Sequence, residues 1–430
     1  MVNRVTVCIR KLSNGRTEAA RFERWLRNKN VSKSALIREE QLRTAEMAKG
    51  RHVLGVQDTT ELNYQRHANR VSGLGTVGNG KDLGFFLHPM VVLDAGSGAC
   101  LGNAAIHIEN RLEGASDTYQ RLSIEEKESY RWISTAQTSK KVLSEAKRIT
   151  FIGDRENDIY EFIDRIPDEK TDVITRIRSD RILMSGEKLY SHIDKVTEAG
   201  RIAITIPAEK RKRREKREAI LSIKYSVVEI KRPKNCSDKK ASESIKLRVV
   251  EAKELNCPIG QEPIHWRLLT THRIEDYEQA LQIVSWYQKR WNIEQVFRTM
   301  KKQGLDIESS QVETAESLMK LAIIGLCAAI KIIQLVLARE GETEQKTEDV
   351  FTQDERIVLA LALTTLEGKT LKQKNPYPQE NLAWATWIIA RLGGWQGYIR
   401  SEGPPGPITI RNGLERFQGI YDGYKLSKIL

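Results

Sequence analysis

Two short apolar runs, each followed by an aspartate, limit what this chain can fold into. HVLGVQ, residues 52–57, leads to Asp58, and RITFIG, residues 148–153, leads to Asp154. Runs of this length and apolar content are typical of buried strands. In α/β sheets, polar residues at the carboxyl ends of strands lie where ligands bind. The pattern therefore predicts an α/β protein with acidic side chains at one edge of its sheet.

The elements around these runs have a recognisable order. Two further strands are expected at 82–95 and 98–110, separated by glycine-rich breaks, and a helix is expected from Ile124 to Lys147. Three strands followed by a helix match the opening of an RNase H-like fold. The next strand is expected at Asp172–Ile177. Strand-like alternation then continues from about residue 186 to 263, which predicts a β-rich insertion.

A second constraint is the stretch Trp286–Gly304, WYQKRWNIEQVFRTMKKQG, which predicts one helix. At 100° per residue, four of its polar residues fall within an arc of about 60° that borders an apolar arc. They are Tyr287, Arg290, Glu294 and Lys301. One interpretation is a solvated stripe with a weak Arg290–Glu294 pair four residues apart. The other is a functional face beside the core.

The spacing of these four residues resembles the Y-R-E-K signature of the bacterial DDE transposases of the insertion-sequence 4 family. DREND, residues 154–158, resembles the DRExD motif of the same family. The resemblance implies that Asp58, Asp154 and Glu294 are catalytic acids and metal ligands. It implies Mg²⁺ as cofactor, with Mn²⁺ able to substitute. Carboxylate oxygens are the hard ligands that Mg²⁺ prefers, and two such ions can serve phosphoryl transfer.

The resemblance also implies a reaction. The enzyme would nick each transposon end, cleave through a DNA hairpin and join the 3′ ends to target DNA. The partners would be double-stranded DNA, both terminal inverted repeats and target, and a second copy of the chain in a synaptic complex.

Two of the aspartates could instead have ordinary structural roles. Asp58 enters a polar loop, where an aspartate can instead bond its own backbone. Asp158 is expected to cap a helix rather than bind metal.

A set of further residues is predicted to contact DNA. Arg176 and Trp266 match family positions that contact end DNA and stack a flipped base, although a solvated arginine and a core tryptophan are the ordinary alternatives. The run at 210–217 lies in the expected insertion, where it is a phosphate-binding loop or only a solvated one. The predicted DNA-binding residues are Tyr287, Arg290, Lys301, Trp266, Arg176, Lys210, Arg211, Lys212, Arg213 and Arg214.

The two ends of the chain are expected to be helical. Arg16–Asn28 and Lys33–Lys49 have helical spacing, and RFERWLRNKNVSKSALI resembles the last part of the family's end-recognition domain, so that domain is expected to be partial here. The chain after Gly304 is expected to be helical to Glu340, and again through Leu366 and at Trp384–Leu392, with GPPGP as a connector. In the family this region pairs two subunits, although packing within one chain is the alternative.

The predicted organisation has five parts. They are a partial N-terminal recognition region (1–50), the first part of the RNase H-like core (51–185), a β-rich basic insertion (186–264), the last core strand and glutamate helix (265–310) and a helical C-terminal dimerisation region (311–430).

Composition agrees with a nucleic-acid partner. The net charge is +13, and the excess of Lys and Arg is concentrated in residues 1–50 and 201–250. Basic regions of this kind bind phosphates with release of counterions. The five cysteines are widely spaced and have no zinc-ligand pattern. We expect a soluble, cytoplasmic, nucleoid-associated chain with no membrane contact.

Two other functions stay open at this point. An N-terminally shortened chain could bind DNA and pair with full-length transposase, which it would inhibit. A metal-dependent nuclease of the same fold would share the three acids but should lack the roles of Trp266 and Tyr287.

Overall fold

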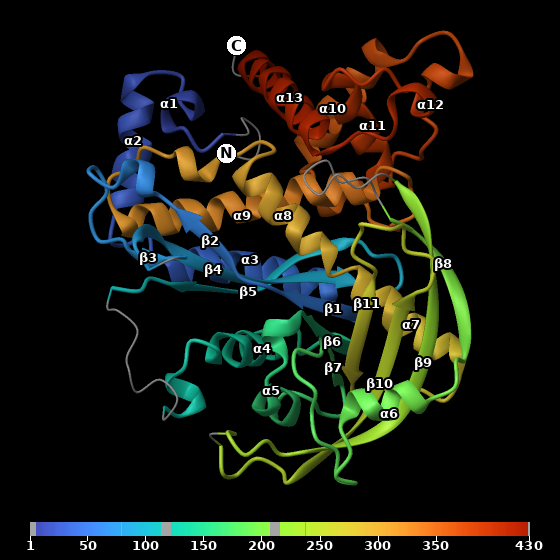
Figure 1. Cartoon of the computed structure of the whole chain (residues 1–430). Coiled ribbons are helices and arrows are strands. Elements are labelled where there is room, and N and C mark those ends of the chain that lie inside the picture. The colour runs from blue at the N-terminus through green and yellow to red at the C-terminus, as the bar shows by residue number, and fades with distance from the viewer. Residues whose placement is uncertain (1–5, 79, 113–121, 207–215, 237, 429–430) are drawn as a thin grey trace.

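The computed structural model describes residues 6–78, 80–112, 122–206, 216–236 and 238–428. The strands among these residues are β1 (His52–Gln57), β2 (Thr60–Asn63), β3 (Gly75–Val77), β4 (Asp82–Asp94), β5 (Cys100–Glu109), β6 (Arg148–Gly153), β7 (Thr171–Arg176), β8 (Gly200–Ile206), β9 (Arg217–Lys231), β10 (Ser244–Glu254) and β11 (His265–Thr270). They form one mixed sheet in the order β2-β4-β1-β6-β7-β11-β10-β9-β8, with β3 and β5 paired to β4 (Figure 1).

The α-helices lie mainly at the two ends of the chain and around the sheet. They are α1 (Ile9–Leu12), α2 (Arg16–Arg27), α3 (Lys33–Ala48), α4 (Tyr130–Val142), α5 (Tyr160–Arg165), α6 (Leu189–Lys195), α7 (Tyr277–Gln288), α8 (Trp291–Lys301), α9 (Ala315–Ala338), α10 (Gln353–Leu366), α11 (Leu382–Leu392), α12 (Ile399–Glu402) and α13 (Pro407–Ser427). A short 3-10 turn, η4 (Arg155–Asn157), follows β6.

Parallel pairing at the centre of the sheet positions the candidate acids. β6 pairs in parallel with both β1 and β7, and Val56 lies opposite Ile152 in the β1–β6 ladder. Asp58 and Asp154 follow two residues later, each one residue past the end of its strand. Because parallel strands in register end at the same level, both aspartates leave the sheet side by side at its carboxyl edge.

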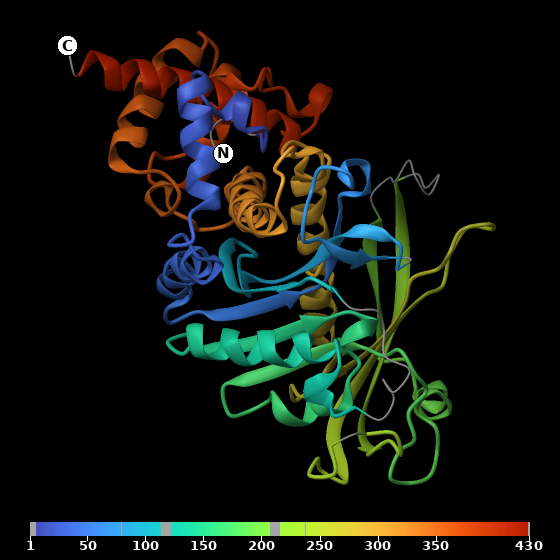
Figure 2. The same cartoon turned by 90° about the vertical axis from the view of Figure 1, so that its left-hand side faces the viewer.

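Side chains that alternate along these strands build two cores. Leu54 and Val56 point into one apolar cluster with α7, α8 and α9, whereas Val53 points into another with α4 and α5. Figure 2 shows these two groups of helices on opposite faces of the sheet. The central strands are thus buried on both sides, as their nearly continuous apolar sequences require.

The predicted fold, an α/β protein with an RNase H-like core and flanking helices, is confirmed. The predicted β-rich insertion does not form a separate sheet. β11 pairs with β7, and β10, β9 and β8 follow outward in antiparallel order. One ladder of backbone hydrogen bonds therefore connects the insertion to the strands that carry the acids.

Several predicted elements differ from the structure. The single helix expected at Trp286–Gly304 is divided between α7 and α8. The expected helix Ile124–Lys147 is limited to α4, after a short 3-10 turn. Beyond Gly304 the chain forms an irregular segment, and α9 begins only at Ala315, with Thr314 as its N-cap.

The last helix, α13, lies in the region 311–430 that was predicted to be helical, but the prediction named no individual helix after Leu392. It begins at Pro407, the last residue of the predicted GPPGP connector, in the first turn, where a missing N–H costs nothing. Its buried residues Ile410, Leu414, Phe417 and Tyr421 have the spacing of one helical face, and this period was the signal that could have predicted it.

The long helix α9 is the centre of the helical region. It is apolar and long enough to cross a membrane by length and composition, but most of it is buried against the rest of the protein. Its buried Lys320 donates two hydrogen bonds of 3.0 Å to the carbonyls of Leu26 and Asn28. The lysine thereby satisfies carbonyls at the C-terminal end of α2.

We expect a glycine contact between α11 and α13 to be essential for their packing. A Cβ atom at Gly413 would collide with the backbone carbonyl of Ile389, whereas Gly419 in the same helix has open space around it. Gly413→Ala should lower the free energy of unfolding by about 1–3 kcal/mol through overpacking. Gly419→Ala, the matched control, should raise it by about 0.5–1 kcal/mol. Denaturant titration of both variants tests this, and a shift in the same direction for both would contradict it.

Candidate active site

The two aspartates at the carboxyl edge are each held by a nearby backbone N–H group. The backbone N–H of Thr59 donates to Oδ1 of Asp58 at 2.8 Å. The backbone N–H of Glu156 donates to Oδ1 of Asp154 at 2.8 Å, so that Asp154 is the N-cap of η4. The local bonding expected for a turn aspartate is therefore present at Asp58, together with the longer-range contacts described next.

The electrostatic environment of Asp58 disfavours its charged form. Burial raises its pKa to about 7, and the neighbouring charge of Asp154 acts in the same direction. Arg290 and the N–H of Thr59 lower the pKa, but they do not outweigh these two effects. The positive charge beside Asp58 is thus too small to offset its burial and the charge of Asp154.

Arg290 connects Asp58 to the third candidate acid. Its Nη1 lies 3.2 Å from Oδ2 of Asp58, and its Nη2 lies 2.6 Å from Oε1 of Glu294. The guanidinium is 16% exposed. Since partly buried ion pairs of Arg are charge-assisted hydrogen bonds, this bridge orders the junction between α7, α8 and β1.

The helix that presents these residues is broken at Lys289 and Arg290. Both residues keep helical dihedral angles, but their N–H groups bond to the carbonyls of Trp286 and Tyr287, three residues back. Tyr287 is therefore the last residue but one of α7, and Arg290 is the residue before α8. The prediction of one regular helix with a single polar face was wrong at this point.

The three acids are not yet arranged as a closed metal site. In the described ranges, no group of three or more His, Cys, Asp or Glu side chains is close enough to hold a metal ion. Glu294 is engaged by Arg290, whereas Asp58 and Asp154 are adjacent. The chemistry of the site nevertheless fits a divalent cation, because two neighbouring carboxylates repel each other and offer hard oxygen ligands.

Three residues predicted to contact DNA gather at the ends of β7, β11 and α7. The rings of Trp266 and Tyr287 meet edge to face, with centroids 5.4 Å apart. Arg176 donates to the carbonyl of His265 at 3.0 Å. Tyr287 is only 4% exposed, and Trp266 is partly buried against the same core. Packing accounts for their present contacts, and DNA contact stays a prediction for all three.

Two other predictions have different outcomes. Asp158 does not cap a helix: its carboxylate accepts from Nε of Arg181 at 3.0 Å and from the N–H of Arg178 at 2.8 Å. The N-cap prediction for Asp158 was wrong because the loop after β7 brings these donors to its carboxylate. The basic run Lys210–Arg214 lies outside the described residues.

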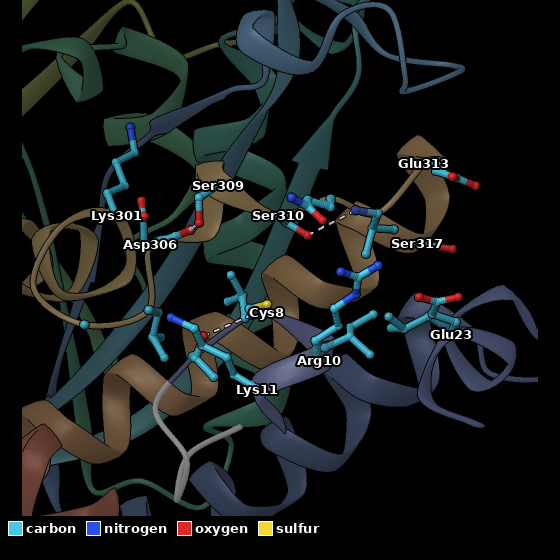
Figure 3. A pocket seen from close by; sticks show the side chains of 18 of the residues that line it. Cys8, Arg10, Lys11, Glu23, Lys301, Asp306, Ser309, Ser310, Glu313 and Ser317 are labelled. Atoms are coloured by element: carbon cyan, nitrogen blue, oxygen red, sulfur yellow. Dashed lines mark hydrogen bonds between the residues drawn. The ribbon is translucent and has the colours of Figure 1, made fainter. Parts of the chain in front are cut away.

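Lys301, at the end of α8, lies at the edge of a pocket of about 1090 Å³ between the N-terminal segment, the α8–α9 connection and α13. Its Nζ is 3.6 Å from Glu308. Figure 3 shows Arg10 and Lys11 on one side of the pocket and Lys301 with Asp306 on another. The charged lining residues are the basic Arg10, Lys11, Arg27, Arg70, Lys301, Lys302 and Arg411 and the acidic Glu23, Asp306, Glu313 and Glu415.

The sequence did not single out most of these basic residues. Within the described part of the chain, Arg10, Lys11, Arg70 and Lys302 have no carboxylate within ion-pair distance. For Arg10 and Lys11 the available signal was the local excess of Lys and Arg in residues 1–50, a region that includes neither Arg70 nor Lys302. Their convergence with Lys302 results from the tertiary fold.

Comparison with known proteins gives a match in the central part of the chain. Residues 133–330 match the family model of the transposase DDE domain, so this part of the chain is similar to that family. A cryo-EM structure of the piggyBac transposase synaptic complex with hairpin DNA is similar at 9% sequence identity and a TM-score of 0.35. The similarity covers 91% of this chain and 64% of that one. At this level it carries no conclusion about function.

We expect the stability of the metal-free protein to report the environment of Asp58. A carboxyl group whose pKa is raised from 3.8 to about 7 stabilises the fold at low pH, and this contribution is lost as the pH rises through 7. Asp58→Asn removes the loss. The free energy of unfolding of Asp58→Asn relative to wild type should therefore increase from pH 5 to pH 8 by up to about 3 kcal/mol, and its melting temperature should rise accordingly. Differential scanning fluorimetry in EDTA measures it, and a difference independent of pH would contradict the assignment.

Proposed function

We propose that this chain is a DNA transposase of the cut-and-paste, hairpin-forming type that the Y-R-E-K signature resembles. The observation that carries the proposal is the convergence of Asp58, Asp154, Arg290 and Glu294 at the carboxyl edge of the sheet, in a chain whose residues 133–330 match a transposase DDE domain. The reaction class is phosphoryl transfer between a water or 3′ hydroxyl and a DNA phosphodiester.

The acids would hold divalent ions, with Mg²⁺ as the physiological choice and Mn²⁺ able to substitute. When bound, such ions supply Lewis-acid stabilisation of phosphate oxygens and lower the pKa of the attacking hydroxyl group. Asp58 and Asp154, which follow paired strands, would be the adjacent ligands. Glu294, one turn beyond Arg290, is the third and becomes available when the guanidinium turns away from it.

Arg290 would have two roles. Without DNA, it neutralises Asp58 and Glu294 through the contacts at 3.2 and 2.6 Å. A phosphate group could replace these carboxylates, since the planar guanidinium binds phosphate with two parallel N–H groups. Glu294 would then join Asp58 and Asp154 around the cation when DNA occupies the site, whereas without DNA the two aspartates alone would hold a cation more weakly.

The basic pocket beyond Lys301 would continue the path of a DNA strand. α8 has 11 residues, so Arg290 and Lys301 are separated along the helix by about 16 Å. This distance corresponds to four or five nucleotides at roughly 3.4 Å each. Lys301, Lys302, Arg10 and Lys11 would bind phosphates upstream or downstream of the cleaved bond.

Each proposed step breaks one phosphodiester bond, either by hydrolysis or by exchange for a new phosphodiester bond. Water attacks at the transposon end and releases a 3′ hydroxyl. That hydroxyl attacks the opposite strand, forms a hairpin and releases the flanking DNA. A second water reopens the hairpin, and the restored 3′ hydroxyl attacks target DNA. Trp266 would stack the base displaced when the hairpin forms, and two copies of the chain, paired through their C-terminal helices, would hold both ends.

Removal of any acid should stop cleavage. Asp58→Ala, Asp154→Ala and Glu294→Ala should each lower the rate of strand cleavage by more than the roughly 100-fold that outer-shell changes cause at metal sites. Asp354→Ala, at an exposed carboxylate paired with Lys428, is the matched control and should cleave normally. Cleavage of a labelled end substrate in Mg²⁺ and gel shift at low salt measure the effects. Near-normal cleavage by one variant would remove that residue from the site.

The role of Trp266 separates this transposase mechanism from a simple nuclease. Trp266→Ala should spare the first nick and slow hairpin formation by roughly 5- to 150-fold, the equivalent of about 1–3 kcal/mol of base stacking. A denaturing gel resolves nicked, hairpin and fully cleaved DNA. Trp395→Ala, whose indole N–H bonds to Gly403 in the C-terminal region, serves as control. Equal slowing of nicking and hairpin formation would make Trp266 a packing residue, and a wild type that forms no hairpin would contradict the mechanism.

A further inference from the structure

The orientation of both aspartates depends on the residues that follow them. Asp58 accepts from the backbone of Thr59, and Asp154 accepts from the backbone of Glu156. A displacement of either following residue would therefore rotate the carboxylate that it holds. Contacts made by the side chains of Thr59 and Glu156 hold these two residues in place.

One arginine contacts both of those side chains. Arg131, in the first turn of α4, donates from Nε to Oγ1 of Thr59 at 3.1 Å. Its Nη2 lies 3.6 Å from Oε2 of Glu156. Its Nη1 is anchored by the carboxylate of Glu109 at 3.4 Å and by the carbonyl of Glu128 at 3.3 Å. The side chain is 12% exposed, so this fork is largely shielded from water.

The hydroxyl of Thr59 extends the contact into the core. Because it accepts from Arg131, its single proton is available to Nδ1 of His88 at 2.8 Å. Nε2 of His88 then carries the ring proton and donates to Oε1 of Gln57 at 3.2 Å. His88 and Gln57 are fully buried, and burial lowers the pKa of His88 well below its usual range, which agrees with a neutral ring.

We propose that Arg131 is a positioning residue that holds the loops after β1 and β6 together and thereby orients Asp58 and Asp154 for cation binding. The inference rests on the proposed function. Arg131 contacts Thr59 and Glu156 from α4, on one face of the sheet, whereas Arg290, the residue before α8, contacts Asp58 from the other face. A planar fork is needed, because one guanidinium must direct separate N–H groups at two loops.

The test compares arginines that both bridge carboxylates. Arg131→Met removes the fork, and Arg131→Lys restores charge with one donor group. Arg165→Met is the control, since Arg165 also joins two acids, Glu125 and Asp238, away from Asp58 and Asp154. Calorimetric titration of the DNA-free protein with Mn²⁺ should show an affinity about 10- to 100-fold lower for Arg131→Met, because outer-shell groups typically contribute this much. Arg131→Lys should recover part of it, and Arg165→Met should match wild type.

A second measurement is independent of metal and of activity. Two-bond ¹H–¹⁵N correlation spectra of the histidine rings report the tautomer of His88. Wild type should show the proton on Nε2, and Arg131→Met should shift this signal toward a mixture, since Thr59 is then free to bond elsewhere. If Arg131→Met fails to fold, Thr59→Val, with Thr59→Ser as its control, removes the same hydrogen bond and gives the same comparison.

The outcomes distinguish this inference from the proposed function. Equal Mn²⁺ affinity for Arg131→Met and Arg165→Met, or an unchanged His88 signal in Arg131→Met, would overturn the positioning role. A wild type that binds Mn²⁺ but cuts no DNA would contradict the proposed function alone, and the metal and His88 measurements would still decide the role of Arg131. A wild type that neither binds Mn²⁺ nor cuts DNA would overturn both.

Discussion

The parallel pairing of β1 with β6 is the interaction on which the rest of the site depends. Its ladder, in which neighbouring strands lie roughly 4.8 Å apart, ends two residues before Asp58 and Asp154 and brings both to the same edge whether or not their charges favour this. Burial and repulsion then disfavour the ionised pair, as the raised pKa of Asp58 shows. Arg290 lies against the acids from one face of the sheet and Arg131 against the following loops from the other. The two arginines offset part of the repulsion between two aspartates that the backbone hydrogen bonds of the β1–β6 ladder keep close together.

The strands that carry the acids could be predicted from sequence because their local properties agree with their final environment. The predicted runs at 52–57 and 148–153 coincide with β1 and β6. Both are buried on two faces, so composition alone identifies them. The break between α7 and α8 could not be predicted in this way. It contains neither Gly nor Pro, and Lys289 and Arg290 keep helical angles, so the change is only a shift to bonding three residues back.

Contacts between distant segments were beyond sequence reasoning for a different reason. Arg131 and Thr59 are 72 residues apart, and no periodic pattern relates them. The same holds for Asn63 in β2 and Glu308, which are 245 residues apart. The carboxylate of Glu308 accepts from the N–H of Asn63 and also lies near Lys301. Spacing rules apply within one element, whereas these partners meet only after α4 and α8 have packed on opposite faces. The Y-R-E-K resemblance identified which residues matter, and tertiary packing determined how they are held.

Because the sheet is continuous from β6 to β9, it fixes the distance between these two strands. β6 and β9 are separated by four strand spacings through β7, β11 and β10, a lateral distance of about 19 Å at roughly 4.8 Å per spacing. A hydrogen-bonded ladder resists stretching in this direction far better than a flexible linker resists bending. The distance between Asp154 and a residue of the outer strands β9 and β8 is therefore nearly constant. It can change only if the sheet twists or its strand pairs separate.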